Sequence, residues 1–221
     1  MMRTIGAALI GILLFPALPA PAGAATNCDN PYVPAREGIS WTYAVTRKSG
    51  GSGSQWTLSV EKVTAGGFDW RYTFPQASFT VTFTCTPAGL SAPGFGLTQI
   101  AQVSGGTFEI TSHSGVGYAP PDKWTVGNSW SASSEGTFTR GGQKFTFKRT
   151  GTFQVLARER VTVPAGAFDA LKLLLTVKGE VGGGGATQPL DARITQWYAS
   201  GVGLVRQEDA TSVHQLVSYR R

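Results

Sequence analysis

Two histidines are the first residues to consider for catalysis, because imidazole is the commonest general base in enzymes. They are His113, in "TSHSG", and His214, in "SVHQL". His113 lies between Ser112 and Ser114, so a hydrolase that combines His113 with a serine and a carboxylate is one hypothesis. No Gly-x-Ser-x-Gly motif appears in a strand-to-helix setting, and serines beside a histidine are also typical of a polar loop. We therefore expect no catalytic residues.

Metal and cofactor sites are not indicated. A zinc or copper enzyme normally needs three or more N or S ligands, and the chain has only two histidines and two cysteines. The glycine run in "GEVGGGGATQP" is not followed by Lys-Ser/Thr or by the start of a helix, which excludes a phosphate-binding loop of that type. The carboxylates of a glycosidase would have to face each other, which the sequence cannot test for candidates on different expected strands: Glu109, Glu135, Asp169 and Asp191.

The N-terminus predicts export. Arg3 precedes an apolar run at residues 5–15, and a stretch rich in Pro and Ala ends at Ala24. This is the pattern of a signal peptide over residues 1–24, and the run is shorter than the roughly twenty residues that span a bilayer. We expect an exported protein of the periplasm or cell surface, with no transmembrane segment in the mature chain. Cys28, preceded by Ala-Thr-Asn, is a poor match to a lipid attachment site.

The charge is modestly basic and dispersed. The formal net charge is +6, and it falls by one when Arg3 leaves with the signal peptide. The basic pairs at 47–48, 148–149 and 220–221 are scattered along the chain, whereas a nucleic-acid surface needs a concentrated stripe. We therefore expect no nucleic-acid partner.

The two cysteines, Cys28 and Cys85, are expected to form a disulfide, because an exported chain matures where such bonds persist. The alternating run "SFTVTFTCT" places Phe79, Val81, Phe83 and Cys85 on one face of a strand. Cys85 would then face the core, and the bond would hold the N-terminal segment under the sheet. The alternative is a pair of buried free thiols.

Period-2 alternation recurs along the chain with turn residues between the runs, and no window of a dozen residues shows helical periodicity. We predict an all-β fold, a strongly coiled antiparallel sheet that forms a half-open barrel or a sandwich, with no substantial helix after the signal peptide. The glycine-rich stretches "KSGGSGSQ", "RGGQ" and "GEVGGGGATQP" are expected to be flexible hairpin tips. The expected strands include "ISWTYAVTRK", "QWTLSVEKV", "SFTVTFTCT", "GTFEITS", "QKFTFKRTGTFQVLA", "ALKLLLTVKG", "LDARITQWYAS", "GLVRQED" and "VHQLVSYR".

Repeated sequence motifs suggest that this single domain, residues 25–221, contains an internal duplication. A Gly-x-Ser-Trp motif, a Glu-x-Val-Thr motif and a Phe-Asp pair occur twice in the same order, and the marker residues are Trp41, Glu61 and Asp69, then Trp130, Glu159 and Asp169. The two similar halves would be residues 31–90 and 120–221, joined by a connector at 91–119. Each tryptophan would lie in the core, and the two aspartates would cap backbone N–H groups at a turn. Chance similarity is the alternative, because the motifs are short.

Three motifs carry a resemblance to a known group. "YVPxxxGISWTY", "VTVPAGAFDALKL" and "WYASGVGLVR" resemble, in that order, a group of uncharacterised exported bacterial proteins. That group is similar to the lipoprotein-carrier (LolA-like) superfamily, whose curved antiparallel sheet can hold an acyl chain on its concave face. The resemblance implies such a sheet here. This sequence departs from the carriers in lacking the helices that fill the concave side.

Three functions remain from the residues and the resemblance. The first is a non-catalytic protein of the cell envelope that binds an apolar or amphiphilic ligand, such as a lipid, or an envelope protein through a concave face. The second is a structural subunit of a surface assembly, and the third is the hydrolase that uses His113. Gly201 and Gly203 would bracket a tight hairpin after strand 190–200. The expected ligand-lining residues are aromatic: Trp56, Tyr72, Trp124, Trp197 and Tyr198.

Overall fold

A computed structural model describes residues 28–51, 53–93 and 106–221. The predicted signal peptide therefore lies outside the described residues. No helix in the described part of the chain is long and apolar enough to cross a membrane.

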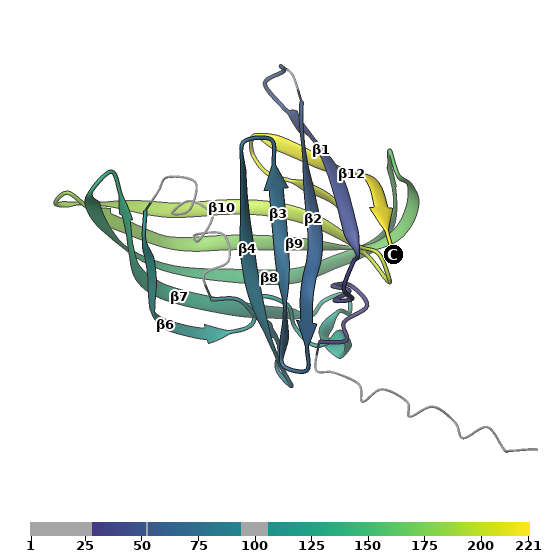
Figure 1. The fold of residues 1–221 in the computed structure, drawn as a ribbon, viewed down its shortest axis with the longest axis horizontal. Coiled ribbons are helices and arrows are strands. Elements are labelled where there is room, and N and C mark those ends of the chain that lie inside the picture. Colours follow the sequence, from purple (N-terminus) through teal and green to yellow (C-terminus); the bar gives the residue numbers. More distant parts are fainter. Residues whose placement is uncertain (1–27, 52, 94–105) are drawn as a thin grey trace, which may run out of the picture.

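The described residues form one antiparallel sheet of twelve strands, which confirms the all-β prediction (Figure 1). The strand order is β5-β4-β3-β2-β1-β12-β11-β10-β9-β8-β7-β6. Strands that pair are therefore consecutive in sequence, except for β1 with β12, and the consecutive strands β5 and β6 form the two edges. The single helical element in this part of the chain is a short 3-10 turn, η1 (Pro121–Lys123). The strands are β1 (Ser40–Arg47), β2 (Ser54–Thr64), β3 (Gly67–Phe74), β4 (Ala77–Thr86), β5 (Gly89–Ser91), β6 (Phe108–Gly115), β7 (Ser129–Arg140), β8 (Gln143–Val163), β9 (Gly166–Gly183), β10 (Ala186–Ala199), β11 (Gly203–Glu208) and β12 (Ser212–Arg220).

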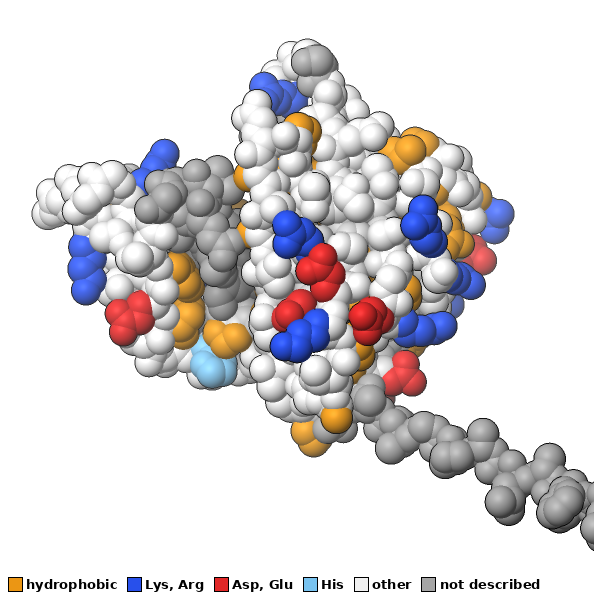
Figure 2. Space-filling model, viewed as in Figure 1, with side chains coloured by type: hydrophobic (Ala, Val, Ile, Leu, Met, Phe, Trp, Pro, Cys, Tyr) orange, Lys and Arg blue, Asp and Glu red, His pale blue; other side chains and the backbone are white. Residues whose placement is uncertain are grey.

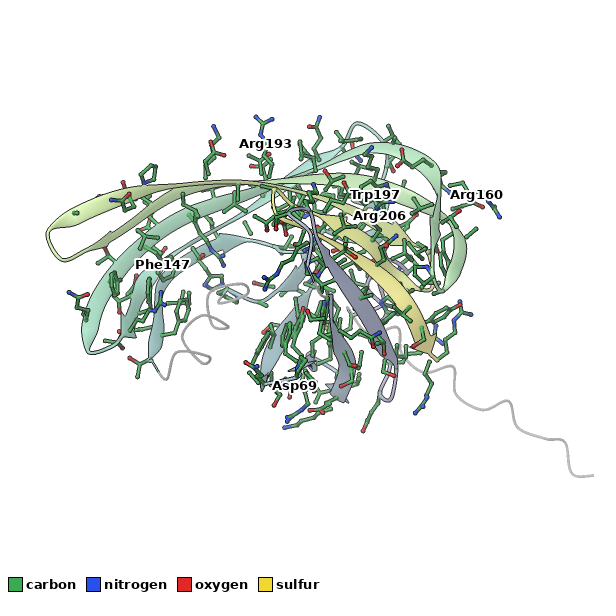
Figure 3. The ribbon with its side chains drawn as sticks, turned by 90° about the horizontal axis from the view of Figure 1, so that it is seen from above. Asp69, Phe147, Arg160, Arg193, Trp197 and Arg206 are labelled. Atoms are coloured by element: carbon green, nitrogen blue, oxygen red, sulfur yellow. A yellow bond between two sulfur atoms is a disulfide. The ribbon has the colours of Figure 1, made fainter. Side chains whose placement is uncertain are left out.

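The sheet coils on itself as a half-open barrel and does not split into the two sheets of a sandwich. The long strands β7 to β10 arch over the space into which β1 to β4 fold back (Figures 1 and 3). Phe147 projects from the concave face of the arch, and Arg193 projects from the opposite face (Figure 3). A bridge between Leu90 and Tyr118 joins β5 to the segment before η1, so the two ends of the sheet approach each other on this side. The core fills the enclosed space.

Strand alternation determines which side chains enter the core. In β4, Phe79, Val81, Phe83 and Cys85 are buried, and the residues between them are half-buried or exposed. Cys85 is bonded to Cys28 with a Cα–Cα distance of 5.0 Å, which confirms the predicted disulfide. The bond fastens the segment before β1 to a strand near one edge of the sheet.

Two hairpins turn on glycine pairs with positive φ. Gly141 and Gly142 have φ of 57° and 78° between β7 and β8, and Gly184 and Gly185 have 60° and 84° between β9 and β10. This is the conformation that two-residue hairpins require. The prediction of a flexible tip over "GEVGGGGATQP" was wrong in extent, because both strands continue to the glycine pair. A Cβ on Gly183 would lie 2.2 Å from Cδ1 of Phe145, so the ring packs on this glycine in a regular ladder.

The two proposed repeats occupy corresponding places in the sheet. In each unit the tryptophan strand pairs with the next strand, and that strand pairs with the Phe-Asp strand: β1, β2 and β3, then β7, β8 and β9. Val63 pairs with Phe68, and Val161 pairs with Phe168. The shared register agrees with a duplication, which stays a prediction. Strand β6 lies within the stretch that we expected to be a connector.

Candidate functional site

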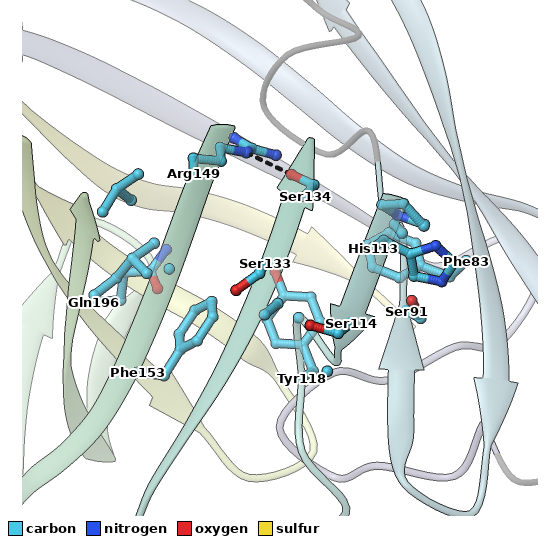
Figure 4. Close-up of a pocket in the computed structure, with 18 residues that line it drawn as sticks. Phe83, Ser91, His113, Ser114, Tyr118, Ser133, Ser134, Arg149, Phe153 and Gln196 are labelled. Carbon is cyan, nitrogen blue, oxygen red and sulfur yellow. Dashed lines mark hydrogen bonds between the residues drawn. The ribbon is translucent and has the colours of Figure 1, made fainter. Parts of the chain in front are cut away.

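Two cavities lie inside the coiled sheet. The first, here called the serine cavity, has a volume of about 110 Å³ and lies between the inner face of β7 to β9 and the region of β4 and β5 (Figure 4). In the space-filling view, hydrophobic side chains gather along the inner edge of the part formed by β6 and β7, facing β4 (Figure 2). The described residues that line the serine cavity are Phe83, Ser91, Ala92, Pro93, His113, Ser114, Gly115, Gly117, Tyr118, Ala132, Ser133, Ser134, Arg149, Gly151, Phe153, Leu175, Val177 and Gln196.

The serine cavity combines an apolar wall with a polar rim. Phe153 of β8 and Leu175 of β9 are cross-strand partners. Two residues further along the ladder, Gly151 pairs with Val177 on the same face. Gly151 leaves room for the cavity because it has no side chain. On the rim, Arg149 Nε donates a hydrogen bond of 3.1 Å to Ser134 Oγ, and burial lowers the pKa of Arg149. Such a site fits an apolar group that ends near hydroxyl groups.

His113 lies on the rim of this cavity, on the edge strand β6, with its side chain exposed. It pairs across the ladder with Ser134, and Ser114 follows it along β6. Ser134 is thus the serine directly opposite His113, and its Oγ accepts a hydrogen bond from Arg149. The described residues around the cavity include no carboxylate. A hydrolase triad at His113 would need both a nucleophile and a carboxylate within hydrogen-bond reach.

The second cavity, here called the aromatic cavity, has a volume of about 190 Å³ and lies under β1, β2 and β3. Its walls are the inward-facing rings of these strands, stacked across the ladder. The ring centroids of Tyr43 and Trp56 are 4.4 Å apart, and those of Trp56 and Tyr72 are 5.7 Å apart. The residues that line it are Val33, Pro34, Trp41, Tyr43, Trp56, Leu58, Trp70, Tyr72, Phe74, Tyr118, Gln196, Tyr198, Gly203, Leu204, Gln207 and His214.

The polar groups of several aromatic residues in this wall are used by the fold. Trp41 Nε1 donates a 2.6 Å bond to the carbonyl of Val202, and Tyr43 Oη donates a 2.8 Å bond to the carbonyl of Leu204. Because the acceptors lie at the start of β11, these bonds hold the aromatic wall of β1 against the β10–β11 hairpin. Burial raises the pKa of Tyr43, so its phenol stays neutral.

His214 closes one end of the aromatic cavity through a chain of hydrogen bonds. Trp56 Nε1 donates to His214 Nδ1 at 3.2 Å, His214 Nε2 lies 3.0 Å from Ser212 Oγ, and Ser212 Oγ donates to Asp209 Oδ2 at 2.7 Å. Burial lowers the pKa of His214, and the nearby Asp209 opposes this shift. Since Nδ1 accepts from Trp56, the imidazole here is neutral. A neutral, hydrogen-bonded histidine positions the ring of Trp56.

Tyr118 and Gln196 belong to the walls of both cavities, so the two spaces meet at these residues. The rings of Tyr118 and Tyr198 pack edge to face, with their centroids 6.1 Å apart. Burial raises the pKa of Tyr118 to about 12, and the pKa of Tyr198 is raised well above its usual value for the same reason. Both phenols are therefore neutral, and the boundary between the cavities carries no charge.

Three of the five expected lining residues are brought together. Trp56, Tyr72 and Tyr198 line the aromatic cavity. Trp124 follows η1, stacks on Tyr32 with ring centroids 4.8 Å apart, and donates to the carbonyl of Ala119. Its ring is buried and lines neither cavity.

Trp197 lies on the opposite face of β10 from Tyr198. Its ring packs against the cations of Lys172, 5.3 Å from the ring centroid, and Arg206, at 5.2 Å (Figure 3). Its Nε1 donates to the carboxylate of Glu159. Trp197 is thus buried by charged side chains on the far side of the sheet from the cavities. The predicted hairpin after it is present, and Gly201 and Gly203 have φ of 71° and 98°.

The predicted turn role of the two aspartates was wrong. Asp69 and Asp169 lie within β3 and β9, and their carboxylates contact side chains of neighbouring strands. Asp69 Oδ1 accepts a 2.7 Å bond from Thr82, and Asp169 forms an exposed ion pair with Arg160 at 3.6 Å. Each turn lies before its aspartate in the sequence, so Asp69 and Asp169 already pair with residues of the neighbouring strands.

Among the residues of the cavity walls that sequence reasoning missed are Tyr43, Trp70, Tyr118 and Gln196. The alternation in "ISWTYAV" carries a signal for Tyr43, because it places Trp41 and Tyr43 on one face. Tyr118 lies in an irregular segment before η1 and carries no periodic signal. Gln196 is a polar residue on the inward face of β10, which alternation alone does not reveal.

The comparisons with known proteins support the fold. A family model described as DUF3108-like matches residues 140–221, and no curated protein matches the chain. The crystal structure of a candidate exported protein with a YmcC-like fold from Bacteroides fragilis has 15% sequence identity and a TM-score of 0.53, covering 85% of this chain and 98% of that one. A candidate lipoprotein from Parabacteroides distasonis has 18% identity and a TM-score of 0.52, with coverage of 87% and 99%. This chain therefore has a YmcC-like fold.

Proposed function

We propose that this chain is a non-catalytic protein of the bacterial cell envelope that binds an apolar or amphiphilic ligand inside its coiled sheet. The observation that carries the proposal is the pair of cavities that meet at Tyr118 and Gln196. Their walls are mainly aromatic and aliphatic, with a few hydroxyl, amide and imidazole groups, which is the usual character of small-molecule sites.

Export is part of the proposal. The N-terminal sequence has the pattern of a signal peptide, and the two similar structures belong to candidate exported proteins or lipoproteins. The Cys28–Cys85 disulfide is typical of an oxidising compartment. The resemblance to the lipoprotein-carrier superfamily supports a ligand with an acyl chain, held on the concave face of a curved sheet.

Catalysis is not part of the proposal. His113 is exposed on an edge strand, and His214 is occupied on both ring nitrogens by Trp56 and Ser212. Within the described residues, no group of three or more histidine, cysteine, aspartate or glutamate side chains could hold a metal ion. Among the described residues, no carboxylate lines the cavity beside His113, and the hydrogen bonds of His214 leave neither ring nitrogen free for a substrate.

Native mass spectrometry tests the proposal. The protein is purified gently from the envelope of its own host, and its mass is compared with that of a denatured sample. We expect an adduct of lipid-like mass that is lost on denaturation. A bare monomer from several gentle preparations would contradict the proposal, and a stable complex with other proteins would favour a subunit of an envelope assembly.

A cavity-filling variant tests the location of the ligand. Ala132 is half-buried in the wall of the serine cavity, and Ser131 is exposed on the opposite face of the same strand. Ala132→Phe should reduce adduct occupancy by about tenfold, because a phenyl ring takes the space of the ligand. Ser131→Phe is the matched control and should leave occupancy unchanged. Equal occupancy in the two variants would place the ligand elsewhere.

A further inference from the structure

The hydrogen bonds of His214 determine which of its ring nitrogens carries the proton. Ser212 has one hydroxyl hydrogen, which it donates to Asp209 Oδ2 at 2.7 Å. Ser212 Oγ therefore accepts from His214 Nε2, 3.0 Å away, so Nε2 carries the proton. On the other side of the ring, His214 Nδ1 accepts from Trp56 Nε1 at 3.2 Å. The neutral imidazole with its proton on Nε2 satisfies both of its neighbours.

A second proton on His214 would suit one side of the ring and not the other. An imidazolium donates from both nitrogens, so Nδ1–H would face the N–H of Trp56 and their hydrogen bond would be lost. On the Nε2 side the bond would become charge-assisted, because Ser212 connects it to the carboxylate of Asp209. The imidazolium would therefore stay with Ser212, and Trp56 would lose its partner.

Asp209 keeps its negative charge over the pH range in which a histidine titrates. Burial favours a higher pKa for Asp209, but hydrogen bonds from Ser212 and Thr211 lower that pKa to about 2. Both residues donate to the carboxylate from their backbone N–H and their hydroxyl groups. The anion that stabilises a protonated His214 is thus already present at neutral pH.

The other charged groups near His214 are exposed or paired. On β1, Arg47 lies two residues beyond the cross-strand partner of His214, and Lys48 Nζ donates to the carbonyl of Asp209 at 2.7 Å. Both cations are exposed, so solvent and salt screen them. On β11, Arg206 and Glu208 pair with each other. The titratable groups that face the cavity from β1, β3, β10 and the segment before η1 are phenols whose pKa is raised by burial, so they are neutral: Tyr43, Tyr72, Tyr198 and Tyr118.

Trp56 is a central part of the wall of the aromatic cavity. Its ring stacks on those of Tyr43, Tyr72 and Phe74, with centroids 4.4 Å, 5.7 Å and 5.7 Å away. Phe74 lines the cavity and is 37% exposed, so the cavity reaches the surface at this end. Loss of the bond to His214 would release the indole there. It would also put a positive charge into a wall whose other described residues include no Lys, Arg, Asp or Glu.

We propose that His214 makes binding in the aromatic cavity sensitive to pH. In its neutral form His214 holds Trp56 in the wall, and protonation of Nδ1 releases Trp56 and weakens the binding of uncharged molecules, which would strip water from the new cation. Linkage is reciprocal, so an occupied cavity keeps His214 neutral to a lower pH. This inference rests on the proposed function and adds a regulation of its site.

Nuclear magnetic resonance of the indole N–H groups tests the hydrogen bond itself. The mature protein, labelled with heavy nitrogen, is titrated between pH 7.5 and 5.0, and the Trp56 signal is assigned by its loss in Trp56→Phe. We expect this signal to shift with a midpoint below pH 6.5, because burial lowers the pKa of His214. His214→Asn should abolish the shift, since an amide oxygen can take the place of Nδ1 and does not titrate. His113→Asn is the matched control: it removes the other histidine of the chain, on β6, and should leave the shift unchanged.

Benzene tests the effect on binding. It is uncharged at every pH, and an apolar cavity of about 150 Å³ holds it, whereas the aromatic cavity has about 190 Å³. The affinity is measured by calorimetry from pH 7.5 downward, and circular dichroism checks that the protein stays folded. The Kd should rise about tenfold for each pH unit below the midpoint, because the fraction of protein that is competent to bind falls by that factor. In His214→Asn the Kd should be the same at each pH.

The outcomes separate this inference from the proposed function. A shift of the Trp56 signal and a loss of benzene affinity that both disappear in His214→Asn support the inference. A Trp56 signal that does not respond to pH, a benzene affinity that is constant or absent, or an unchanged response in His214→Asn overturns it. The proposed function is tested separately by native mass spectrometry, so an adduct found there leaves that function standing when the inference fails.

Discussion

The Cys28–Cys85 disulfide should contribute a large share of the stability of this fold. The two cysteines are separated by 57 residues, and a loop of that length gives about 4 kcal/mol in the chain-entropy model, because the bond restricts the unfolded chain. For a domain of this size, 1 kcal/mol corresponds to about 2–4 °C in melting temperature. Reduction should therefore lower the melting temperature by about 8–16 °C. The bond also holds the segment before β1 against β4, near one edge of the sheet.

The assay compares oxidised and reduced protein of identical sequence. Both forms are equilibrated in urea, unfolding is followed by tryptophan fluorescence, and the free energy of unfolding is obtained by linear extrapolation. The reduced sample must be unfolded with reductant and refolded in its presence, because the cysteines are only 2% and 7% exposed. The control is the double variant Cys28→Ala and Cys85→Ala, in which the reductant should have no effect.

The difference in the free energy of unfolding between the oxidised and reduced protein tests this prediction. A difference below about 1 kcal/mol would refute it, since the unfolded chain would then already hold these segments close together without the bond. A steeper dependence on urea for the reduced form would support it, because that form exposes more surface when it unfolds.

The remaining predictions concern His214 and Gly183. Burial lowers the pKa of His214 below its usual 6.5, so the unfolded chain takes up the proton first as the pH falls, and the free energy of unfolding should decrease below about pH 6.5 by at most about 1.4 kcal/mol per pH unit. His214→Gln should flatten this part of the profile measured by urea unfolding between pH 7.5 and 5.5, and an unchanged slope would assign the effect to other groups. Gly183→Val should destabilise the protein by about 1–3 kcal/mol, because its Cβ would lie 2.2 Å from the Phe145 ring. Gly185→Val is the comparison, because Gly185 has a φ of 84° and nothing within 4 Å of an added Cβ, so this variant tests backbone strain without a clash. An unchanged melting temperature for Gly183→Val would contradict the packing of Phe145 on Gly183.

Local patterns predicted most of the strands. The run "SFTVTFTCT" predicted the burial of Phe83 and Cys85, and the glycine pairs at 141–142 and 184–185 predicted the positions of two hairpins. Strand length was harder to predict. Gly179 and Gly183 look like loop residues in the sequence, yet they belong to β9 because the β8 backbone packs close to Gly179 and the Phe145 ring lies over Gly183.

The candidate site depended on contacts that no local pattern encodes. Trp56 and Tyr72 were expected to line a ligand site, and they do line the aromatic cavity, but Trp197 is buried by Lys172 and Arg206 on the other face of its strand. Alternation separated Trp197 from Tyr198 without revealing which of the two faces a cavity. At this end of the sheet both faces are covered, so the aromatic character of a residue does not identify its environment.

By itself, the sequence determined the all-β fold, the inward and outward faces of individual strands and a pair of cysteines suited to a bond, because strand periodicity and turn chemistry act between residues close along the chain. Only the tertiary structure decided that β1 pairs with β12, that the sheet coils without splitting, and that Tyr118 and Gln196 separate two cavities. Those features arise from pairing over most of the chain length and from the accumulated twist of twelve strands, which no short stretch of residues specifies.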